Sequence, residues 1–414
     1  MKTLAPSKAA PTTQARRARA AVAVLFLTNG AVFANLVPRY PAIVDQLGLA
    51  NAQFGLAVAA FPLGALLAGL AAGVLIRRFR SSRVAVAGTA LTSAGIFVAG
   101  TSPAWGLLAA GLFAAGAMDA ITDVAQNSHG LRVQRLYRRS IINSFHAVWS
   151  IGAVLGGLMG TAAAAWGMPL TVHLAVSGAL FTLLAAACYP FLLPGGEPEA
   201  TKPEAGGTAV GHPSSVTPHL RRYGILAALV LIAMAGTLVE DAGSSWAALY
   251  LVNGLNASAP VAGLGFVALV GAQFAGRLMG DRLVDRFGQR AVAQAGGAVA
   301  AAGMGLALAF PSVPGTVIGF AAAGLGVATL VPAAMQSADA LPWLRPGTGL
   351  TVVSWLMRLG FLISPPVVGA VADTAGLRAG LLVIPLAGLA VLAASPVLAK
   401  RAGACPDPRV AGWN

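Results

Sequence analysis

The sequence predicts an all-α membrane protein in which twelve transmembrane helices form two pseudo-symmetric six-helix bundles. Of its 414 residues, 57% are hydrophobic and only 10% are charged, whereas a soluble domain carries about 25% charged residues. Continuous apolar segments of about 20 residues recur, which is the length a helix needs to cross a bilayer. A membrane β-barrel would show short alternating segments instead.

The apolar segments predict the helices in order along the chain. They are expected at 19–40, 50–76, 84–102, 104–130, 140–164, 170–193, 222–252, 259–281, 290–310, 313–337, 347–372 and 377–400. The Pro-, Gly-, Ser- and Glu-rich segment 194–221 predicts a flexible cytoplasmic linker between bundles at 19–193 and 222–400. Residues 1–18 and 401–414 are expected to be tails, and the first helix is expected to be retained.

The net charge of +14 is concentrated in every second connection. The arginines of these basic segments are Arg16, Arg17 and Arg19 before the first helix, Arg77, Arg78, Arg80 and Arg83 after the second, Arg132, Arg135, Arg138 and Arg139 after the fourth, Arg221 and Arg222 before the seventh, and Arg277, Arg282, Arg286 and Arg290 around the connection after the eighth. This pattern predicts an inner (plasma) membrane protein with both termini in the cytoplasm. It argues against nucleic-acid binding.

Other functional classes lack their motifs. The two cysteines, Cys188 and Cys405, do not suggest a disulfide framework. We find no nucleotide-binding loop, metal cluster or catalytic triad. No enzymatic activity, cofactor or metal ion is therefore expected, and the chain is expected to be monomeric.

The two bundles show related sequences. The stretch GVLIRRFRSSR (73–83) resembles GDRLVDRFGQR (280–290), VAQNS (124–128) resembles AAMQS (333–337), and SIGAVLGGLMG (150–160) resembles RLGFLISPPVVG (358–369). The offset is close to 208 residues in all three pairs. Parallel repeats of this kind are typical of transporters with a site between the halves.

The stretch DRLVDRFGQR resembles the signature loop of the major facilitator superfamily. Asp285, Arg286, Gly288 and Arg290 match its pattern, while Asp281 stands where the first Gly is expected. In the first copy Gly73 and Arg78 match, but Arg77 and Arg80 occupy the Asp and Gly positions. The resemblance implies that these loops form a cytoplasmic gate, built differently in the first half.

A narrower resemblance involves the fourth and fifth helices. The stretches TDVAQNSHG and NSFHAVWSIGAVLGG are similar to the acid-x-Ala-x-Asn and Gly-rich pattern of the fucose–proton symporter-like branch. This resemblance implies a role in proton coupling for Asp123.

Four acidic residues are expected inside the bilayer, where a charge must pair, face a cavity or reach the headgroups. Asp119 and Asp123 share one face of the fourth helix. The two acids form a proton site, or alternatively Asp123 pairs with Arg77 or Arg132. Glu240 and the adjacent Asp241 point about 100° apart on the seventh helix. We expect Glu240 to face the cavity and join proton coupling, while Asp241 contacts a neighbouring helix; a purely structural pair is the alternative.

Arg358 is the only cation expected deep in the bilayer. Because a guanidinium stays charged, it needs a partner, and Glu240 or Asp241 is the expected one. Arg358 either forms a structural salt bridge or meets an anionic or strongly polar substrate.

Polar and aromatic side chains in the predicted helices are further candidates for substrate binding. They are Asn29, Asn35, Asn127, His146, Trp149, Trp246, Gln336 and Trp355. Helix–helix hydrogen bonds and packing explain the same residues without a ligand.

These features predict a proton-coupled secondary active transporter that moves a small polar solute, sugar-like or polyol, by alternating access. Arg358 favours an anionic group on that solute. The expected partners are this solute, protons and membrane lipid. The first alternative is a proton antiporter that exports drugs or natural products, and the second is a receptor-like protein that no longer transports. A channel is least favoured.

Overall fold

The structure is a computed structural model that describes residues 12–137, 141–195, 219–344 and 347–399. Most of the predicted linker 194–221, residues 1–11 of the predicted N-terminal tail, and the tail 401–414 with Cys405 lie outside these residues. Within the described part of the chain, twelve helical spans are long and apolar enough to cross a membrane. The predicted helical membrane fold is therefore confirmed.

The N-terminal bundle contains six spans. They are α1 (Thr13–Leu36) with η1 (Val37–Arg39) and α2 (Tyr40–Leu47); α3 (Asn51–Ala68) with η2 (Gly69–Ala71) and α4 (Ala72–Phe79); α5 (Ser81–Gly100); α6 (Trp105–Tyr137); α7 (Ile142–Ala165); and α8 (Leu170–Cys188) with η3 (Tyr189–Phe191). The first helix begins earlier than expected because the Thr12 side chain accepts a hydrogen bond from the Ala15 amide at 3.2 Å and caps it.

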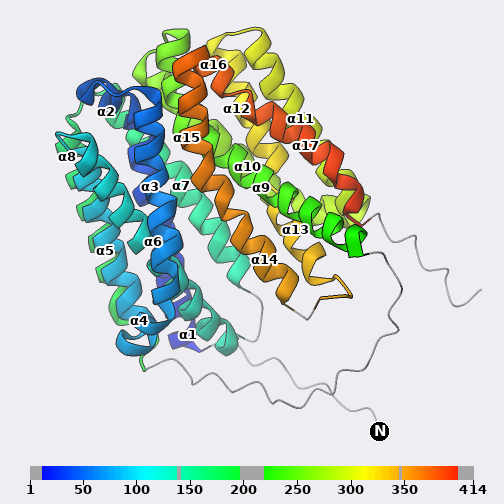
Figure 1. The fold of residues 1–414 in the computed structure, drawn as a ribbon. Helices are drawn as coiled ribbons and strands as arrows, with labels where there is room; N and C mark the ends of the chain where they lie inside the picture. The colour runs from blue at the N-terminus through cyan, green and yellow to red at the C-terminus, as the bar shows by residue number, and fades with distance from the viewer. Residues whose placement is uncertain (1–11, 138–140, 196–218, 345–346, 400–414) are drawn as a thin grey trace, which may run out of the picture.

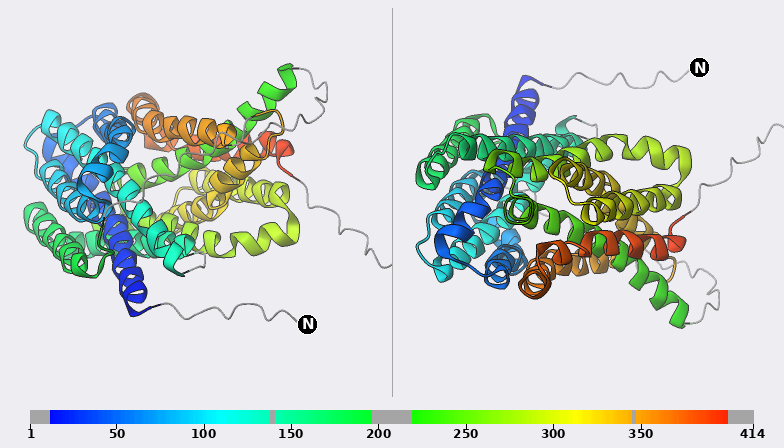
Figure 2. Two further views of the ribbon diagram at one scale, coloured as in Figure 1. Left: turned by 90° about the horizontal axis from the view of Figure 1, so that it is seen from below. Right: turned by 90° about the horizontal axis from the view of Figure 1, so that it is seen from above.

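The C-terminal bundle repeats this arrangement. Its spans are α9 (His219–Leu249) with η4 (Tyr250–Gly254); α10 (Ala259–Phe287); α11 (Gln289–Ala309); α12 (Val313–Val327) with α13 (Leu330–Asp339); α14 (Thr348–Leu356) with α15 (Arg358–Ala375); and α16 (Leu377–Gly380) with α17 (Val383–Ala394) and η5 (Ser395–Val397). The two bundles lie side by side, the first in blue to green and the second in green to red (Figure 2).

The molecule has two distinct ends. We call the end that carries Arg77, Arg78, Arg135 and Arg286 the basic end, and the end that carries α2 and α16 the closed end (Figure 1). At the closed end the two bundles meet, because α3 packs on α15 and α10 packs on α7. Toward the basic end the ribbons of the two bundles diverge (Figure 1).

Glycines allow the close approach at the closed end. A Cβ atom added to Gly55 on α3 would overlap the Pro365 carbonyl oxygen on α15. A Cβ atom added to Gly263 on α10 would overlap the Thr161 hydroxyl on α7. Gly55 and Gly263 are 208 residues apart, so the same close contact occurs at both inter-bundle interfaces.

The predicted repeat is also visible in backbone geometry at the basic end. The helix after the first copy of the loop motif begins past Arg80, with φ 73° and ψ 143°; in the second copy Gly288 has φ 83° and ψ 154°. The Arg80 amide donates to the Ile76 carbonyl and the Gly288 amide to the Val284 carbonyl, both at 2.8 Å. Arg80 therefore adopts a backbone conformation that normally belongs to glycine.

We predict that Arg80→Gly stabilises the protein by about 1 kcal/mol, because glycine relieves the strain of this conformation. The measurement is the thermal unfolding of purified protein. Arg80→Ala is the matched control, since it removes the same charge but keeps a Cβ atom. Equal stability of the two variants would contradict the prediction.

Candidate functional site

Charged side chains lie well inside the helices and face the interface between the bundles. Asp123 on α6 is within electrostatic range of His146 on α7 and Arg358 on α15, and His146 is within range of Arg277 on α10. Because α6 and α7 belong to one bundle and α10 and α15 to the other, these charges interact across the boundary between the bundles. We call this group, together with Asp119, Asn29, Trp149, Glu240 and Gln273, the inter-bundle site.

Asp119 is held by neutral partners. The Asn29 Nδ2 atom donates to Asp119 Oδ1 at 2.7 Å, and the Trp149 indole N–H donates to Asn29 Oδ1 at 2.9 Å. This chain of hydrogen bonds links α6, α1 and α7. The Asn29 amide thus binds an acceptor with its nitrogen and a donor with its oxygen. Both predicted residues, Asn29 and Trp149, therefore orient Asp119 in this structure.

Asp123 lies one turn nearer the basic end. The Asn127 amide donates to Asp123 Oδ1 at 3.0 Å and to the Asp123 carbonyl at 2.9 Å. Arg132, one expected alternative partner, donates to the Pro194 carbonyl at 2.8 Å. The electrostatic surroundings of Asp123 include His146 and Arg358. Asp123 thus lies where a cation from the other bundle can reach it.

Glu240 has two partners on α10. The Gln273 amide donates to Glu240 Oε2 at 2.7 Å, and an Arg277 nitrogen lies 3.6 Å from the same oxygen. The expected pairing of Glu240 or Asp241 with Arg358 does not occur among the ion pairs of the described residues. Arg277 lies within the expected helix 259–281, and α10 continues beyond that range to Phe287.

Gln273 and Arg277 are the functional candidates that sequence reasoning missed. They are four residues apart and therefore share one face of α10. A polar pair on one face of an otherwise apolar helix was the available signal. The arginines that follow Arg277 in the sequence, Arg282, Arg286 and Arg290, obscure this signal. Arg358 is consequently not the only cation inside the helices.

Asp241 lies apart from Glu240, as the 100° rotation between neighbours predicts. Its side chain is 8% exposed, Ser245 Oγ donates to Oδ1 at 3.5 Å, and the Ser364 side chain of α15 lies beside the carboxylate. Tyr40 of the other bundle is within electrostatic range. Asp241 therefore faces the inter-bundle interface nearer the closed end.

Several predicted binding residues have packing contacts elsewhere. Trp246 is 0% exposed and packs edge-on against Phe54, with ring centroids 5.3 Å apart. Asn35 Oδ1 binds His173 Nε2 at 2.9 Å and so joins α1 to α8. Gln336 accepts a hydrogen bond from Gln289 at the basic end. In this conformation none of these three belongs to the inter-bundle site.

Trp355 and Arg358 lie on consecutive segments of one span. The Trp355 side chain is 52% exposed, and the spacing of three residues places it near the face of Arg358. The α14–α15 boundary at Met357 separates them, and the Thr237 hydroxyl of α9 donates to the Met357 carbonyl at 2.9 Å.

The residues of the predicted cytoplasmic gate lie at the basic end. The Arg78 guanidinium lies over the Phe79 ring at 5.9 Å, and Arg286 lies over Phe287 at 5.3 Å. The Arg290 amide donates to the Ala399 carbonyl at 3.1 Å. Asp285 forms no ion pair within the described part of the chain. Gly73 and Arg77 lie in α4, and Gly288 lies in the connection between α10 and α11.

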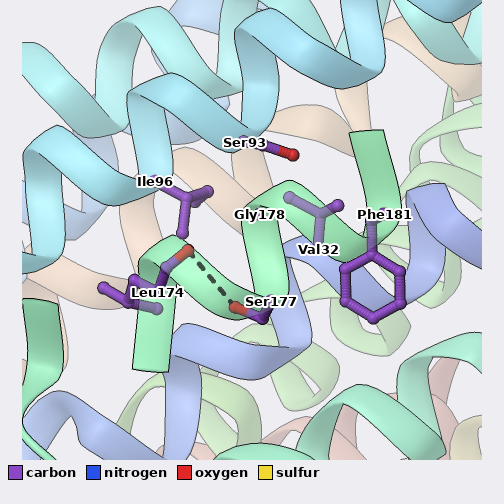
Figure 3. Close-up of a pocket in the computed structure, with 7 residues that line it drawn as sticks. All are labelled: Val32, Ser93, Ile96, Leu174, Ser177, Gly178 and Phe181. Carbon is purple, nitrogen blue, oxygen red and sulfur yellow. Dashed lines mark hydrogen bonds between the residues drawn. The ribbon is translucent and has the colours of Figure 1, made fainter. Parts of the chain in front are cut away.

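The crevice in Figure 3 is a poor alternative site. Val32 of α1, Ile96 of α5 and Phe181 of α8 line it, and Ser177 donates to the Leu174 carbonyl of its own helix at 3.4 Å (Figure 3). Its lining carries no charged side chain. A polar solute finds more partners in the inter-bundle site.

The contacts of Glu240 predict energetic coupling to Arg277. Glu240→Gln and Arg277→Gln should each lower thermal stability, whereas the double variant should lose less than the sum. The expected coupling is about 0.5 kcal/mol, since Arg277 is partly exposed. Arg282→Gln combined with Glu240→Gln is the control and should be additive. Additivity for the Glu240–Arg277 pair as well would contradict the assignment.

Comparisons with known proteins agree with this architecture. The family model for the Major Facilitator Superfamily matches residues 22–283 and 241–409. An uncharacterised transporter, y4wD of Sinorhizobium fredii (strain NBRC 101917 / NGR234), is 31% identical over 379 residues, covering 91% of this chain and 97% of that protein. The membrane protein MosC of Rhizobium meliloti is 29% identical over 391 residues, covering 94% and 92%.

Solved structures show the same fold at low sequence identity. The nucleoside transporter NupG has a TM-score of 0.70 at 11% identity, covering 93% of this chain and 99% of that one. A bacterial homologue of the human lysosomal transporter Spinster, inward-facing and unoccupied, has a TM-score of 0.69 at 15% identity, covering 94% and 98%. FucP in the outward conformation has a TM-score of 0.58 at 19% identity, covering 91% and 97%. The family resemblance of the loop motif is thereby confirmed: the chain belongs to the major facilitator superfamily and is one of its multi-pass membrane transporters.

Proposed function

We propose that this transporter is driven by protons and moves a small polar organic solute across the inner membrane by alternating access. One observation carries the proposal. Acids and cations interact electrostatically across the boundary between the bundles, with Asp123 on α6 and Arg358 on α15. Charges in such a place are costly unless they bind a solute, a proton or each other.

The distribution of arginines supports an orientation. The positive-inside rule places the basic end in the cytoplasm and the closed end outside. The closed end is the one at which glycine contacts join the bundles, so this conformation faces inward.

The proposed coupling residues are Asp123 and Glu240, with Asp119 as a third acid. Asp119 has only neutral hydrogen-bond partners within the described residues, Asn29 being the direct one. Such an acid can hold a proton without losing an ion pair. Glu240 instead has Arg277 at 3.6 Å. Protonation of Glu240 would release Arg277 toward a substrate, and this exchange would couple the two events.

The proposed substrate is a hydroxylated solute with an anionic or strongly polar group. Asn127, His146 and Gln273 offer hydrogen bonds, while Arg277 and Arg358 offer positive charge. Trp149 and Trp355 provide aromatic surface for a ring. The structural relative NupG is a nucleoside transporter, and a nucleoside is a polyhydroxylated solute of this general kind.

We predict that solute-dependent proton flux in reconstituted liposomes is lost in Asp123→Asn and Glu240→Gln. Sugars, polyols, sugar acids, nucleosides and cationic drugs form the test panel, and a pH-sensitive dye in the lumen reports the flux. Asp45→Asn is the matched control, because Asp45 is exposed on α2 and outside the inter-bundle site. This variant should transport normally.

The direction of proton flux relative to the solute, together with the flux in each variant, distinguishes the alternatives. Proton flux in the same direction as the solute supports symport, and flux in the opposite direction would replace it with antiport export. Unchanged flux in Asp123→Asn would contradict the coupling role of that acid. Solute binding without any transmembrane flux would favour the receptor-like alternative.

A further inference from the structure

Asp373, in the last turn of α15, contacts the first turn of α3 in the other bundle. Its Oδ1 atom accepts hydrogen bonds from the Asn51 backbone amide and the Asn51 side-chain amide, both at 2.9 Å. Its Oδ2 atom accepts from the Ala52 backbone amide, also at 2.9 Å. We call this arrangement the Asp373 cap.

The start of α3 needs a cap that the residues next to it in the sequence do not provide. The first amides of a helix have no partner within the helix. Ser, Thr, Asp or Asn normally supplies one from the N-cap position, but here that position holds Ala50. The Gln53 side chain binds the Ala50 amide at 3.1 Å and leaves the Asn51 and Ala52 amides to Asp373.

The position of Asp373 is unfavourable for its own helix. A carboxylate in the last turn lies at the negative end of the helix dipole, whereas one at the first turn of α3 lies at a positive end. Charge-assisted hydrogen bonds are also stronger than neutral ones. The carboxylate therefore gains its favourable interactions across the bundle interface and not within α15.

The equivalent interface in the other half lacks this acid. The repeat offset of 208 residues relates Asn51 to Ala259 at the start of α10, and Asp373 to Ala165 at the end of α7. Both interfaces share the close glycine contact at Gly55 and Gly263. Only the α3–α15 interface adds a charged contact of this kind within the described residues.

We propose that the Asp373 cap holds the closed end shut and must break for that end to open, which makes Asp373 a positioning residue of the transport cycle. The inference rests on the proposed alternating access. The three hydrogen bonds are solvent-exposed, so water can replace them when the bundles separate. Such a contact favours closure without preventing opening.

The test uses the full chain with both native cysteines replaced, Cys188→Ala and Cys405→Ala, and a reporter introduced by Ser364→Cys. Ser364 is 1% exposed on α15, next to the Gly55–Pro365 contact. Intact cells are treated with a membrane-impermeant maleimide, and the labelling rate reports opening of the closed end. Labelling needs neither solute nor proton flux, so failure of the proposed function leaves this readout intact.

Asp373→Ala should raise the labelling rate about tenfold, which corresponds to about 1.4 kcal/mol. Asp373→Asn should give a smaller increase, because an amide keeps one acceptor oxygen but no charge. Asp45→Ala, which removes an exposed acid from the same end, should leave the rate unchanged. An unchanged rate in Asp373→Ala would overturn the proposal.

A second variant separates closure from simple helix capping. Ala50→Asp supplies a cap to α3 from its own N-cap position. Combined with Asp373→Ala, it should restore thermal stability but leave the labelling rate high. If Ala50→Asp also returns the rate to that of the parent, Asp373 merely caps a helix, and its role in holding the bundles together is wrong.

Discussion

The cost of a charge in hydrocarbon organises the centre of this transporter. Each bundle carries ionisable side chains at depths where lipid cannot solvate them: Asp119 and Asp123 in one, and Glu240, Arg277 and Arg358 in the other. Such charges are stable where they face the protein interior and find partners, as they do along the boundary between the bundles. Neutral partners such as Asn29 and Gln273 fix the acids there. Under the proposed function, a solute or proton that changes these charges would act where the two bundles face each other.

The duplication gives the two interfaces a common frame, and individual residues make them different. Gly55 and Gly263 permit the same close approach in both halves. Arg80 adopts the backbone conformation of Gly288, so the loop geometry survives a substitution that is sterically unfavourable. Asp373 adds a charged contact at one interface where Ala165 stands at the other. The repeat accounts for the geometry that the two halves share, and under our proposal Asp373 is the departure that favours closure of one end.

Much of the fold could be predicted from the sequence, because apolar length and positive charge are properties of single segments. The twelve helices, the offset of 208 residues and the placement of Asp119, Asp123 and Glu240 inside helices all followed from such local patterns. The hydrogen-bond and ion-pair partners of these residues could not be predicted from such local patterns. Glu240 binds Gln273 and Arg277 and not the expected Arg358, because the choice depends on how α9 and α10 pack. Trp246 is buried at an interface, and the Asp373 cap joins residues 322 positions apart; neither is visible to a pattern within one helix.

The most direct test of the account is a pair of distance distributions from double electron–electron resonance, recorded in nanodiscs on cysteine-free backgrounds. One pair of spin labels, at Ala104 and Pro311, reports the closed end, and the other, at Arg135 and Ala340, reports the basic end. Alternating access predicts that a transported solute together with a change of pH lengthens the first distance and shortens the second in the same population. Distances that stay fixed under every solute and pH, or that lengthen together at both ends, would contradict alternating access around the inter-bundle site.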